Sequence, residues 1–590
     1  MTPITRCFDL LDMYRTSFGN KPDMYGAKVN GAWKTWSTDE AIATINHAAA
    51  GLINAGVKKG DRVGIMSANR PEWNFADFGI QLCGAVSVPV YPNLSEQDLA
   101  FVIKDAGLVA FFTDSKVLAD KVALGAQQAG VAVNIYTFDA AEGYKSFSAL
   151  TEEGKNNPQT SVIDDVKRTT DPDALLTLLY TSGTTGTPKG VMLSHANLVQ
   201  NFTILCDLPP VDHTSRALSF LPLNHIYERM LSYLYLFRGP SIYYAESIEK
   251  VGDNIRELKP HMFTCVPRLV EKVFDRIMAK GEELTGFKRK LFFWAVELGE
   301  QYDVPEKRSA WYNFKLSIAS ALIFKKWREA LGGNVRAMVS GGAALNVRLA
   351  KIFWAAGIPV LEGYGLTETS PVIAVNTLEP GNMFFGTVGP VVRNGEVKFG
   401  PDGEILFKGP NVMKGYWNRP DATAEVMSPD GFFHTGDIGE LVNGKYLKIT
   451  DRKKEIFKTS QGKYIAPQRI ESLLCQSRFV EQAMVVGEGE KFAAAVIVPS
   501  FQFCKDWAAR KNLNIGSTNS EIASNETLLK RIRQDVEVAN KSLANYEQIK
   551  KIVLIDRAFS VDTGELTPKL SLKRKVVLKN YETQIASLFA

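Results

Sequence analysis

The amino-acid sequence predicts an α/β protein in which a large, doubly wound N-terminal domain with a β-rich subdomain precedes a small α+β C-terminal domain. Three observations support this fold class. Helical and strand patterns alternate from about residue 40 to residue 136, which is typical of a mostly parallel sheet covered by helices. Beyond Gly400 the segments become short and carry strand and turn signals. After residue 450 a new α/β pattern begins, so we expect one domain over residues 1–450 and another over residues 451–590.

The alternation can be followed element by element. Ser37 can cap a helix over residues 37–55, whose apolar side chains recur at the spacing of one helical face. A short apolar strand follows at residues 62–67, and Pro71 marks the start of the next helix because proline is favoured in a first turn. The same order continues, with strands expected at residues 85–91, 109–113 and 131–136 and helices at residues 95–106 and 117–129.

Residues 270–331 interrupt this alternation with a long helical pattern that mixes basic and aromatic side chains. One interpretation is a helical insertion that packs on the sheet. The other is an amphipathic element that touches a membrane or an apolar ligand. In the C-terminal domain, hydrophobic strands are expected at residues 482–486 and 493–499.

Composition and charge exclude several classes of protein. The 590 residues carry 69 Lys and Arg against 64 Asp and Glu, and this net charge of +5 argues against a protein that coats nucleic acid. A hydrophobic fraction of 45% excludes global disorder. The six cysteines lie far apart, which favours reduced thiols in a cytoplasmic protein. No stretch of about 20 apolar residues indicates a membrane span, whereas peripheral membrane contact and a homodimer stay open.

The most specific motif is the string YTSGTTGTPKG at residues 180–190, which follows an apolar strand-like run. Glycines let backbone N–H groups approach an anion, hydroxyls add donors and Lys189 adds positive charge, so the string suits a polyphosphate. It is not G-x-x-x-x-G-K-[ST], which disfavours an ordinary P-loop enzyme. The candidate phosphate-binding residues are Thr181, Ser182, Gly183, Thr184, Thr185, Gly186 and Lys189.

This string resembles the phosphate loop of the adenylate-forming, AMP-binding enzymes, which include acyl-CoA synthetases, firefly luciferases and peptide-synthetase adenylation domains. The resemblance covers nearly the entire chain, because further motifs match in the same order. They are LPLNHIYERM at residues 221–230, SGGAAL at 340–345, EGYGLTET at 362–369, FHTGDIG at 433–439 and DRKKEIFKTSQGKYIAPQRIE at 451–471.

The resemblance implies roles for the nucleotide-binding residues, with Tyr364 stacking on adenine. Thr367 is expected to contact phosphate, and Glu368 with Thr184 to hold Mg²⁺, which prefers oxygen ligands. Asp437 is expected to accept hydrogen bonds from the ribose hydroxyls. Arg452 would reach the ribose too, unless it forms an ion pair at the start of a helix. The residues expected around adenine are Gly341, Gly342, Ala343, Glu362, Gly363, Tyr364 and Gly365.

The implied mechanism is two displacements on bound reactants. A carboxylate attacks the α-phosphate of ATP to give acyl-AMP and pyrophosphate, and a thiol then attacks the acyl carbonyl and releases AMP. The protein supplies positioning and charge rather than a nucleophile. By resemblance, Lys573 supplies the cation for adenylation, with Lys569 as the alternative; a solvated basic tail is also open. His225 would lie near the carboxylate tunnel, or else be structural.

Rotation of a mobile C-terminal domain about Asp451 is expected to bring Gly462 and Lys463 into the thiol tunnel. Gln461 and Ser571 depart from the family pattern, which puts the geometry of their segments in doubt.

Three segments resemble the long-chain branch of the family: residues 261–274, the helical insertion, and GELTP at residues 564–568. The expected substrates are therefore a long-chain fatty acid, ATP and CoA. Two alternatives remain: a fatty acyl-AMP ligase that loads a carrier protein, and a catalytically silent lipid-binding member. A basic and aromatic cluster is the expected membrane contact, and it comprises Lys288, Arg289, Lys290, Phe292, Phe293 and Trp294.

Overall fold

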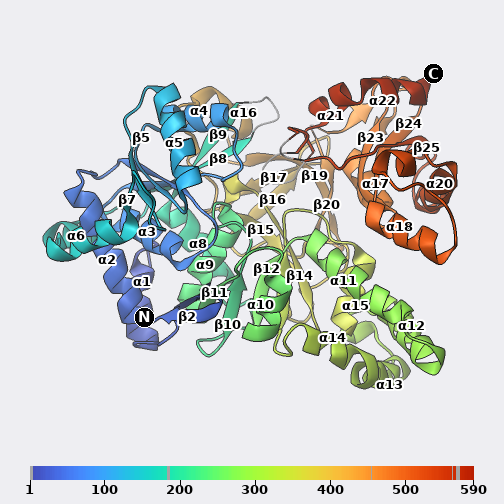
Figure 1. Ribbon diagram of the computed structural model, residues 1–590, viewed down its shortest axis with the longest axis horizontal. Helices are drawn as coiled ribbons and strands as arrows, with labels where there is room; N and C mark the ends of the chain where they lie inside the picture. Colours follow the sequence, from blue (N-terminus) through green and yellow to red (C-terminus); the bar gives the residue numbers. More distant parts are fainter. Residues whose placement is uncertain (1–3, 183–186, 454, 561–562, 567–571) are drawn as a thin grey trace. The chain divides into compact units, whose positions relative to one another are not determined.

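The computed structural model describes residues 4–182, 187–453, 455–560, 563–566 and 572–590 (Figure 1). The chain divides into two compact units. The first contains Met1–Val397, Phe407–Phe433 and Leu441–Leu447, and the second contains Lys398–Leu406, His434–Glu440 and Lys448–Ala590. The fold class predicted from the sequence is confirmed: mixed sheets with helices form the large unit, and the small one is α+β. The domain boundary at residue 450 stays a prediction.

One sheet of the first unit has the strand order β18-β9-β8-β4-β3-β5-β6-β7. It is parallel from β8 to β7, whereas β9 and β18 join its edge in antiparallel orientation. The strands are β3 (Arg62–Met66), β4 (Val86–Pro89), β5 (Leu108–Thr113), β6 (Asn134–Thr137), β7 (Lys145–Ser146), β8 (Leu175–Ser182), β9 (Pro188–Ser194) and β18 (Gly415–Tyr416).

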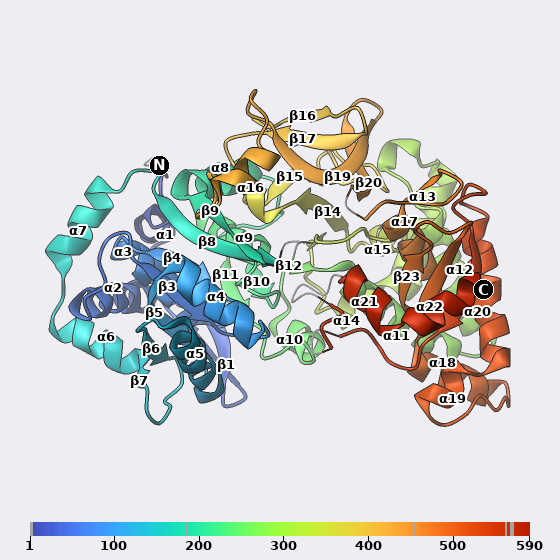
Figure 2. The same cartoon turned by 90° about the horizontal axis from the view of Figure 1, so that it is seen from above.

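Helices cover both faces of this sheet, with α4 and α5 on one face and α2 and α3 on the other (Figure 2). The predicted start of α2 is confirmed: Ser37 and Glu40 form a capping box, in which each side chain accepts a hydrogen bond from the backbone of the other residue. Pro71 is the first residue of α3, as expected. The helices are α2 (Thr38–Asn54), α3 (Pro71–Leu82), α4 (Glu96–Ala106), α5 (Lys116–Ala129), α6 (Phe147–Asn156) and α7 (Thr160–Thr169).

A second sheet of the first unit has the order β15-β14-β13-β12-β10-β11-β1-β2 and is parallel except at its two edges. From β10 the chain passes to β11 on one side and then returns to β12 on the other. Such a reversal of strand order is where open α/β sheets bind ligands, beyond the carboxyl ends of the strands. The strands are β1 (Tyr25–Val29), β2 (Ala32–Trp36), β10 (Arg216–Ser219), β11 (Ser241–Tyr244), β12 (Met262–Cys265), β13 (Ala337–Ser340), β14 (Val360–Gly365) and β15 (Val372–Val375).

The other helices outside the insertion in this unit are α1 (Asp9–Phe18), α8 (His195–Leu205), α9 (Ile226–Arg238), α10 (Val251–Leu258), α15 (Val347–Ala355), the 3₁₀ helix η3 (Thr367–Thr369) and α16 (Pro420–Val426).

Between β12 and β13 the chain forms the predicted run of helices, and it packs on the sheet. Phe292 and Trp327 share a hydrophobic cluster with Phe263 and Met338 of the strands. Phe292 is therefore buried and does not fit the membrane contact that the sequence suggested, whereas Phe293 and Trp294 are half-buried against the same cluster and their part in such a contact stays a prediction. The elements are α11 (Pro267–Glu282), α12 (Gly286–Glu300), η1 (Pro305–Lys307), α13 (Ala310–Ala319), the π-helical segment η2 (Ser320–Phe324) and α14 (Lys325–Ala330).

The β-rich segment forms a sheet with the order β16-β17-β19-β20. Its strands are β16 (Glu396–Phe399), β17 (Glu404–Lys408), β19 (Phe433–Val442) and β20 (Tyr446–Arg452).

The sheet near the C-terminus has the order β23-β24-β25, and β24 is buried on both faces. Ala493, Ala495 and Ile497 belong to one hydrophobic cluster, while the alternate residues of the strand belong to another. Burial on both faces explains the uninterrupted apolar run in the sequence.

The remaining strands and helices of the second unit are β21 (Phe457–Lys458), β22 (Tyr464–Ile465), α17 (Pro467–Leu474), β23 (Val480–Val486), β24 (Ala493–Pro499), α18 (Phe501–Arg510), α19 (Asn519–Ala523), α20 (Glu526–Asn540), β25 (Ile549–Leu554), α21 (Arg574–Asn580) and α22 (Glu582–Phe589).

Among the described residues, no helix is long and apolar enough to cross a membrane.

Candidate active site

The glycine- and hydroxyl-rich string includes the end of β8 and the start of β9, which are antiparallel. Thr181 pairs with Lys189 and Ser182 with Pro188. The predicted loop residues Gly183, Thr184, Thr185 and Gly186 lie outside the described residues.

Tyr416 links the phosphate-loop strand to the predicted Mg²⁺ ligand. It lies on β18, directly opposite Val191 of β9. The Nζ of Lys189 is 5.1 Å from the centre of the Tyr416 ring, and the Tyr416 hydroxyl donates a hydrogen bond of 2.9 Å to Oε1 of Glu368. Burial and the adjacent carboxylate raise the pKa of Tyr416, so the phenol remains a donor. Three segments distant in the sequence therefore meet here.

Glu368 lies in η3, which contacts β9. Its carbonyl oxygen accepts a hydrogen bond of 2.8 Å from the Met413 backbone, which fixes the turn. Over the described ranges, no group of three or more His, Cys, Asp or Glu side chains could hold a metal ion. A lone carboxylate fits Mg²⁺, since this ion usually binds one or two carboxylates and takes its other oxygens from substrate phosphates and water. Thr184, the other predicted ligand, is not among the described residues, and Thr367 is buried beside Glu368.

The predicted adenine-binding segments lie next to each other at the ends of β13 and β14. Ser340, the last residue of β13, pairs with Glu362 of β14. The two segments that follow this pair are neighbours at its start: Gly341, Gly342 and Ala343 come after Ser340, and Gly363, Tyr364 and Gly365 come after Glu362 on β14. Two of the glycines are required by their positions. Gly342 has φ +81°, and a Cβ at Gly365 would lie 1.7 Å from the Pro371 carbonyl oxygen.

Glu362 is a buried carboxyl at this edge. Burial raises its pKa to about 8, so the group is neutral over most of the physiological range.

His225 forms the N-cap of α9, where its Nδ1 accepts a hydrogen bond of 3.1 Å from the Tyr227 backbone. His225 thus has a structural contact in the helix cap, and its role near the substrate carboxylate stays a prediction. The Tyr227 hydroxyl donates 3.2 Å to the carbonyl of Val339, and its ring lies 3.3 Å from the position that a Cβ on Gly341 would take. The helix start is thus packed against the predicted adenine segment.

Glu228, which the sequence analysis missed, lies where the strand order reverses between β10 and β12. The Glu228 carboxyl accepts a hydrogen bond from the hydroxyl of Thr264 on β12. A hydrogen bond with the side chain of Ser219, at the end of β10, also stabilises the charged form of Glu228. Burial outweighs both and raises the pKa of Glu228 to about 7. Nothing in the string HIYER distinguishes this glutamate from an exposed helical one, so only the packing reveals it.

Arg229 anchors the same helix to the other sheet. Its guanidinium is fully buried and forms an ion pair of 2.6 Å with Asp77 of α3. It also donates to the hydroxyls of Thr177 on β8 and Ser87 on β4, at 2.8 and 2.7 Å. This network fixes α9, and with it His225 and Glu228, relative to the phosphate-loop strand.

In the second unit, the two predicted ribose contacts are already paired. Asp437 is buried on β19, and Arg452 at the end of β20 brings Nε to 3.3 Å from its Oδ1. Arg452 ends a strand, so the alternative of an ion pair at a helix start is wrong. The neighbouring Asp451 is buried too, and burial raises its pKa to about 6.

Gly462 and Lys463 lie in the hairpin turn between β21 and β22. Gly462 has φ +79°, a conformation that favours glycine. The hydroxyl of Thr459 accepts a hydrogen bond of 3.2 Å from the Lys463 backbone. Because Gly462 takes the left-handed position, the turn accommodates Gln461.

Lys573 is exposed at the start of α21, and its backbone donates 2.8 Å to the carbonyl of Glu565. Arg574, the next residue, is instead held in ion pairs with the carboxylates of Glu455 and Glu471. Of these two cations, Lys573 alone is exposed to solvent. The alternative residue Lys569 and the departure Ser571 belong to the segment without a description.

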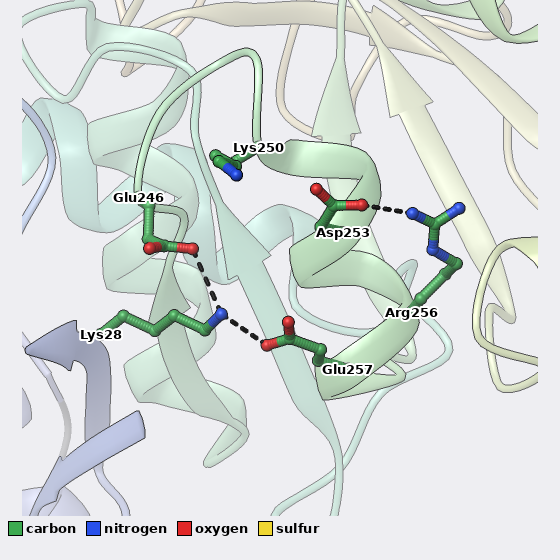
Figure 3. Close-up of a pocket in the computed structure, with 6 residues that line it drawn as sticks. All are labelled: Lys28, Glu246, Lys250, Asp253, Arg256 and Glu257. Atoms are coloured by element: carbon green, nitrogen blue, oxygen red, sulfur yellow. Dashed lines mark hydrogen bonds and ion pairs between the residues drawn. The ribbon is translucent and has the colours of Figure 1, made fainter. Parts of the chain in front are cut away.

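A surface pocket of about 370 Å³ lies elsewhere in the first unit (Figure 3). Lys28 bridges Glu246 and Glu257 there, and Asp253 pairs with Arg256. Lys250 completes a lining made of charged side chains, which does not suit an acyl chain.

Comparisons with known proteins identify the family of the chain. The AMP-binding enzyme model matches residues 15–417, and that of the AMP-binding enzyme C-terminal domain matches residues 454–590. The fold and site define an adenylate-forming, acyl-activating enzyme. The chain belongs to the AMP-binding enzyme family.

Its relatives include long-chain-fatty-acid–CoA ligases. The FadD15 ligase of Mycobacterium bovis is 34% identical over 573 residues, which cover 96% of this chain and 94% of the relative. Long-chain-fatty-acid–CoA ligase 1 of Homo sapiens is 32% identical over 588 residues, which cover 94% of this chain and 82% of the relative.

Solved structures share the fold at lower identity. The adenylation domain of a carboxylate reductase from Mycobacterium chelonae has a TM-score of 0.76 at 22% identity, covering 100% of this chain and 92% of that one. The O-succinylbenzoate CoA synthetase of Bacillus subtilis, in complex with ATP and a magnesium ion, has a TM-score of 0.67 at 22% identity, covering 96% and 98%.

Proposed function

We propose that this protein is a long-chain fatty acid–CoA ligase, which converts a fatty acid and ATP to acyl-AMP and pyrophosphate and then transfers the acyl group to CoA with release of AMP. The observation that carries the proposal is the full-length relationship to long-chain ligases, together with the Lys189–Tyr416–Glu368 assembly at the phosphate-loop strand.

In this proposal, residues of both units contribute to ATP binding. Lys189 and the loop from Thr181 to Gly186 hold the polyphosphate, while Asp437 and Arg452 hold the ribose. Glu368 and Thr184 would hold Mg²⁺, which would supply positive charge to the phosphates. Tyr416 would help to orient the Glu368 carboxylate through its hydrogen bond to Oε1.

The two chemical steps use different parts of the second unit. Lys573 places its charge beside the α-phosphate, where negative charge builds up as the carboxylate attacks. The hairpin with Gly462 and Lys463 then helps to guide the thiol of CoA to the acyl carbonyl. The protein itself forms no covalent intermediate.

Chain-length selectivity is assigned to the buried strand β12 (Met262–Cys265) and its surroundings. Each buried CH₂ of the acyl chain contributes about 0.8 kcal/mol, so a long apolar pocket distinguishes long acids from short ones. Glu228 and Thr264 place a polar pair at this strand. We propose that the pair marks the carboxylate end of the pocket.

The test is palmitate-dependent release of pyrophosphate, measured with and without CoA, followed by mass detection of palmitoyl-CoA. Acetate at the same concentration serves as the control acid. The proposal predicts palmitoyl-CoA in amounts equal to the pyrophosphate released. Release without palmitoyl-CoA would favour the carrier-loading ligase, and no release would favour a silent lipid-binding protein.

A further inference from the structure

Helix α13 and the π-helical segment η2 expose a line of large apolar side chains to solvent. Trp311, Phe314, Ile318 and Leu322 are 64%, 55%, 36% and 52% exposed. Their spacing of three or four residues places them on one helical face. The Trp311 and Phe314 rings stack at 5.5 Å, so they form one continuous surface. We call these four residues the α13 stripe.

The opposite side of the same segment is firmly packed. Phe324 and Trp327 are buried against each other, and Trp327 also contacts Phe292 of α12. The Tyr312 hydroxyl donates 2.8 Å to the carbonyl of Leu298 on α12, which lies beside α13 (Figure 1). The helix is thus held by its inner face, so the exposure of the stripe is a property of the folded unit.

Positive charges outnumber negative ones around the stripe, although Lys325 pairs with Glu329 at 4.0 Å. Residues 310–326 contain Lys315, Lys325 and Lys326 and no acidic residue. Lys315 lies over the Trp311 ring at 5.7 Å. Residues 286–331 contain nine Lys and Arg against five Asp and Glu. The start of α12 adds Phe287, 77% exposed, directly before three basic residues.

We propose that the α13 stripe is a docking face for an anionic lipid surface. An amphipathic helix with aromatic residues on one face and lysines beside them binds in the plane of a bilayer, where the rings enter the headgroup boundary and the lysines approach lipid phosphates. The four side chains offer on the order of 400 Å². A stable protein interface needs about 800 Å² from each partner, so a lipid surface suits the stripe better than a second copy.

This inference goes beyond the proposed function, and its test requires no catalysis. The full-length protein is sedimented with phosphatidylcholine vesicles and with vesicles containing phosphatidylglycerol, without ATP or fatty acid. We expect binding to be about tenfold or more stronger to the anionic vesicles. The double variant W311A/F314A should lose most of this binding. The control variant V117A/V538A removes apolar side chains on α5 and α20 that are at least as exposed as Trp311 and Phe314. This control should bind vesicles like the wild type.

Charge is tested separately. The variant K315E/K325E/K326E should lose the preference for anionic vesicles, whereas K505E/K530E/K541E, with the same change in net charge at exposed lysines of the second unit, should keep it. Circular dichroism and the melting temperature verify that each variant folds.

Two results would overturn the proposal. One is unchanged vesicle binding by W311A/F314A. The other is a lipid-free dimer of the wild type, seen by sedimentation velocity, that the same variant converts to monomers, because the stripe would then be an interface between copies.

Discussion

The hydroxyl of Tyr416 donates a hydrogen bond of 2.9 Å to Oε1 of Glu368, and the same ring lies 5.1 Å from the Nζ of Lys189. Tyr416→Phe keeps the ring beside Lys189 and removes only the donor to the carboxylate. A hydrogen bond to a charged group contributes about 1.5–3 kcal/mol, so we expect the Mg²⁺ concentration required for half-maximal pyrophosphate release to rise about tenfold. An unchanged Mg²⁺ dependence in this variant would show that Tyr416 does not orient the metal ligand.

Asp437 is expected to bind the ribose of ATP. Asp437→Ala removes the acceptor for both hydroxyls and leaves Arg452 without its partner, so we expect ATP affinity to fall about 100-fold. Isothermal titration with ATP measures this directly. Asp402→Ala, which removes an exposed carboxylate paired with Lys453 in the same unit, is the control and should bind ATP normally.

Lys573→Ala tests whether Lys573 acts in adenylation and not in thioester formation. We expect adenylation to slow by about 10² to 10³, because a cation facing developing charge is lost. Thioester formation from supplied acyl-AMP should continue at the wild-type rate. Lys575→Ala, two residues further and also exposed, is the matched control. If Lys573→Ala adenylates at full rate, another cation, with Lys569 the first alternative, performs this role.

Glu228 makes stability depend on pH in a defined direction. Its pKa rises from 4.5 to about 7 on folding because the carboxyl is buried. The folded state therefore binds more protons between these values, and the free energy of unfolding falls as pH rises through them. Glu228→Gln should remove this decrease and, at pH 8, be more stable than the wild type by up to about 3 kcal/mol. Chemical denaturation from pH 5 to pH 8 checks it, and parallel profiles for the two proteins would contradict it.

The buried pair of Arg229 and Asp77 should be strongly coupled. Arg229→Met leaves the Asp77 carboxylate buried without a counter-charge, at a cost of about 3–5 kcal/mol. The double variant D77L/R229M should recover much of that loss, because neither charge remains. Melting temperatures of the two single variants and the double variant measure the coupling, and additive losses would exclude it.

Local signals in the sequence predicted many element boundaries well. Pro71 begins α3 and Ser37 caps α2 because both effects act within one turn of the helix. The division into two large sheets could not be predicted in the same way. Pairs such as Tyr25 with Ile242 bring together strands more than 200 residues apart, and no pattern within either strand specifies its partner.

The same limit applies to the candidate site. Glycine and hydroxyl content identified the strands around the phosphate loop, but Tyr416 and Glu228 act through contacts set by the register of distant strands. In the insertion, the helices were predicted, but periodicity did not show which face of α12 is buried, because this helix is apolar over much of its surface. Packing alone decides that Phe292 faces the core while Phe287 faces solvent.

The central claim, that this protein activates a carboxylate by attack on the α-phosphate of ATP, is tested most directly with palmitate labelled with ¹⁸O in its carboxyl group. Mass spectrometry of the products locates the label after the complete reaction with ATP and CoA. The proposed mechanism predicts one ¹⁸O atom in AMP and none in pyrophosphate. Label in inorganic phosphate with ADP as the nucleotide product, or AMP without label, would contradict it.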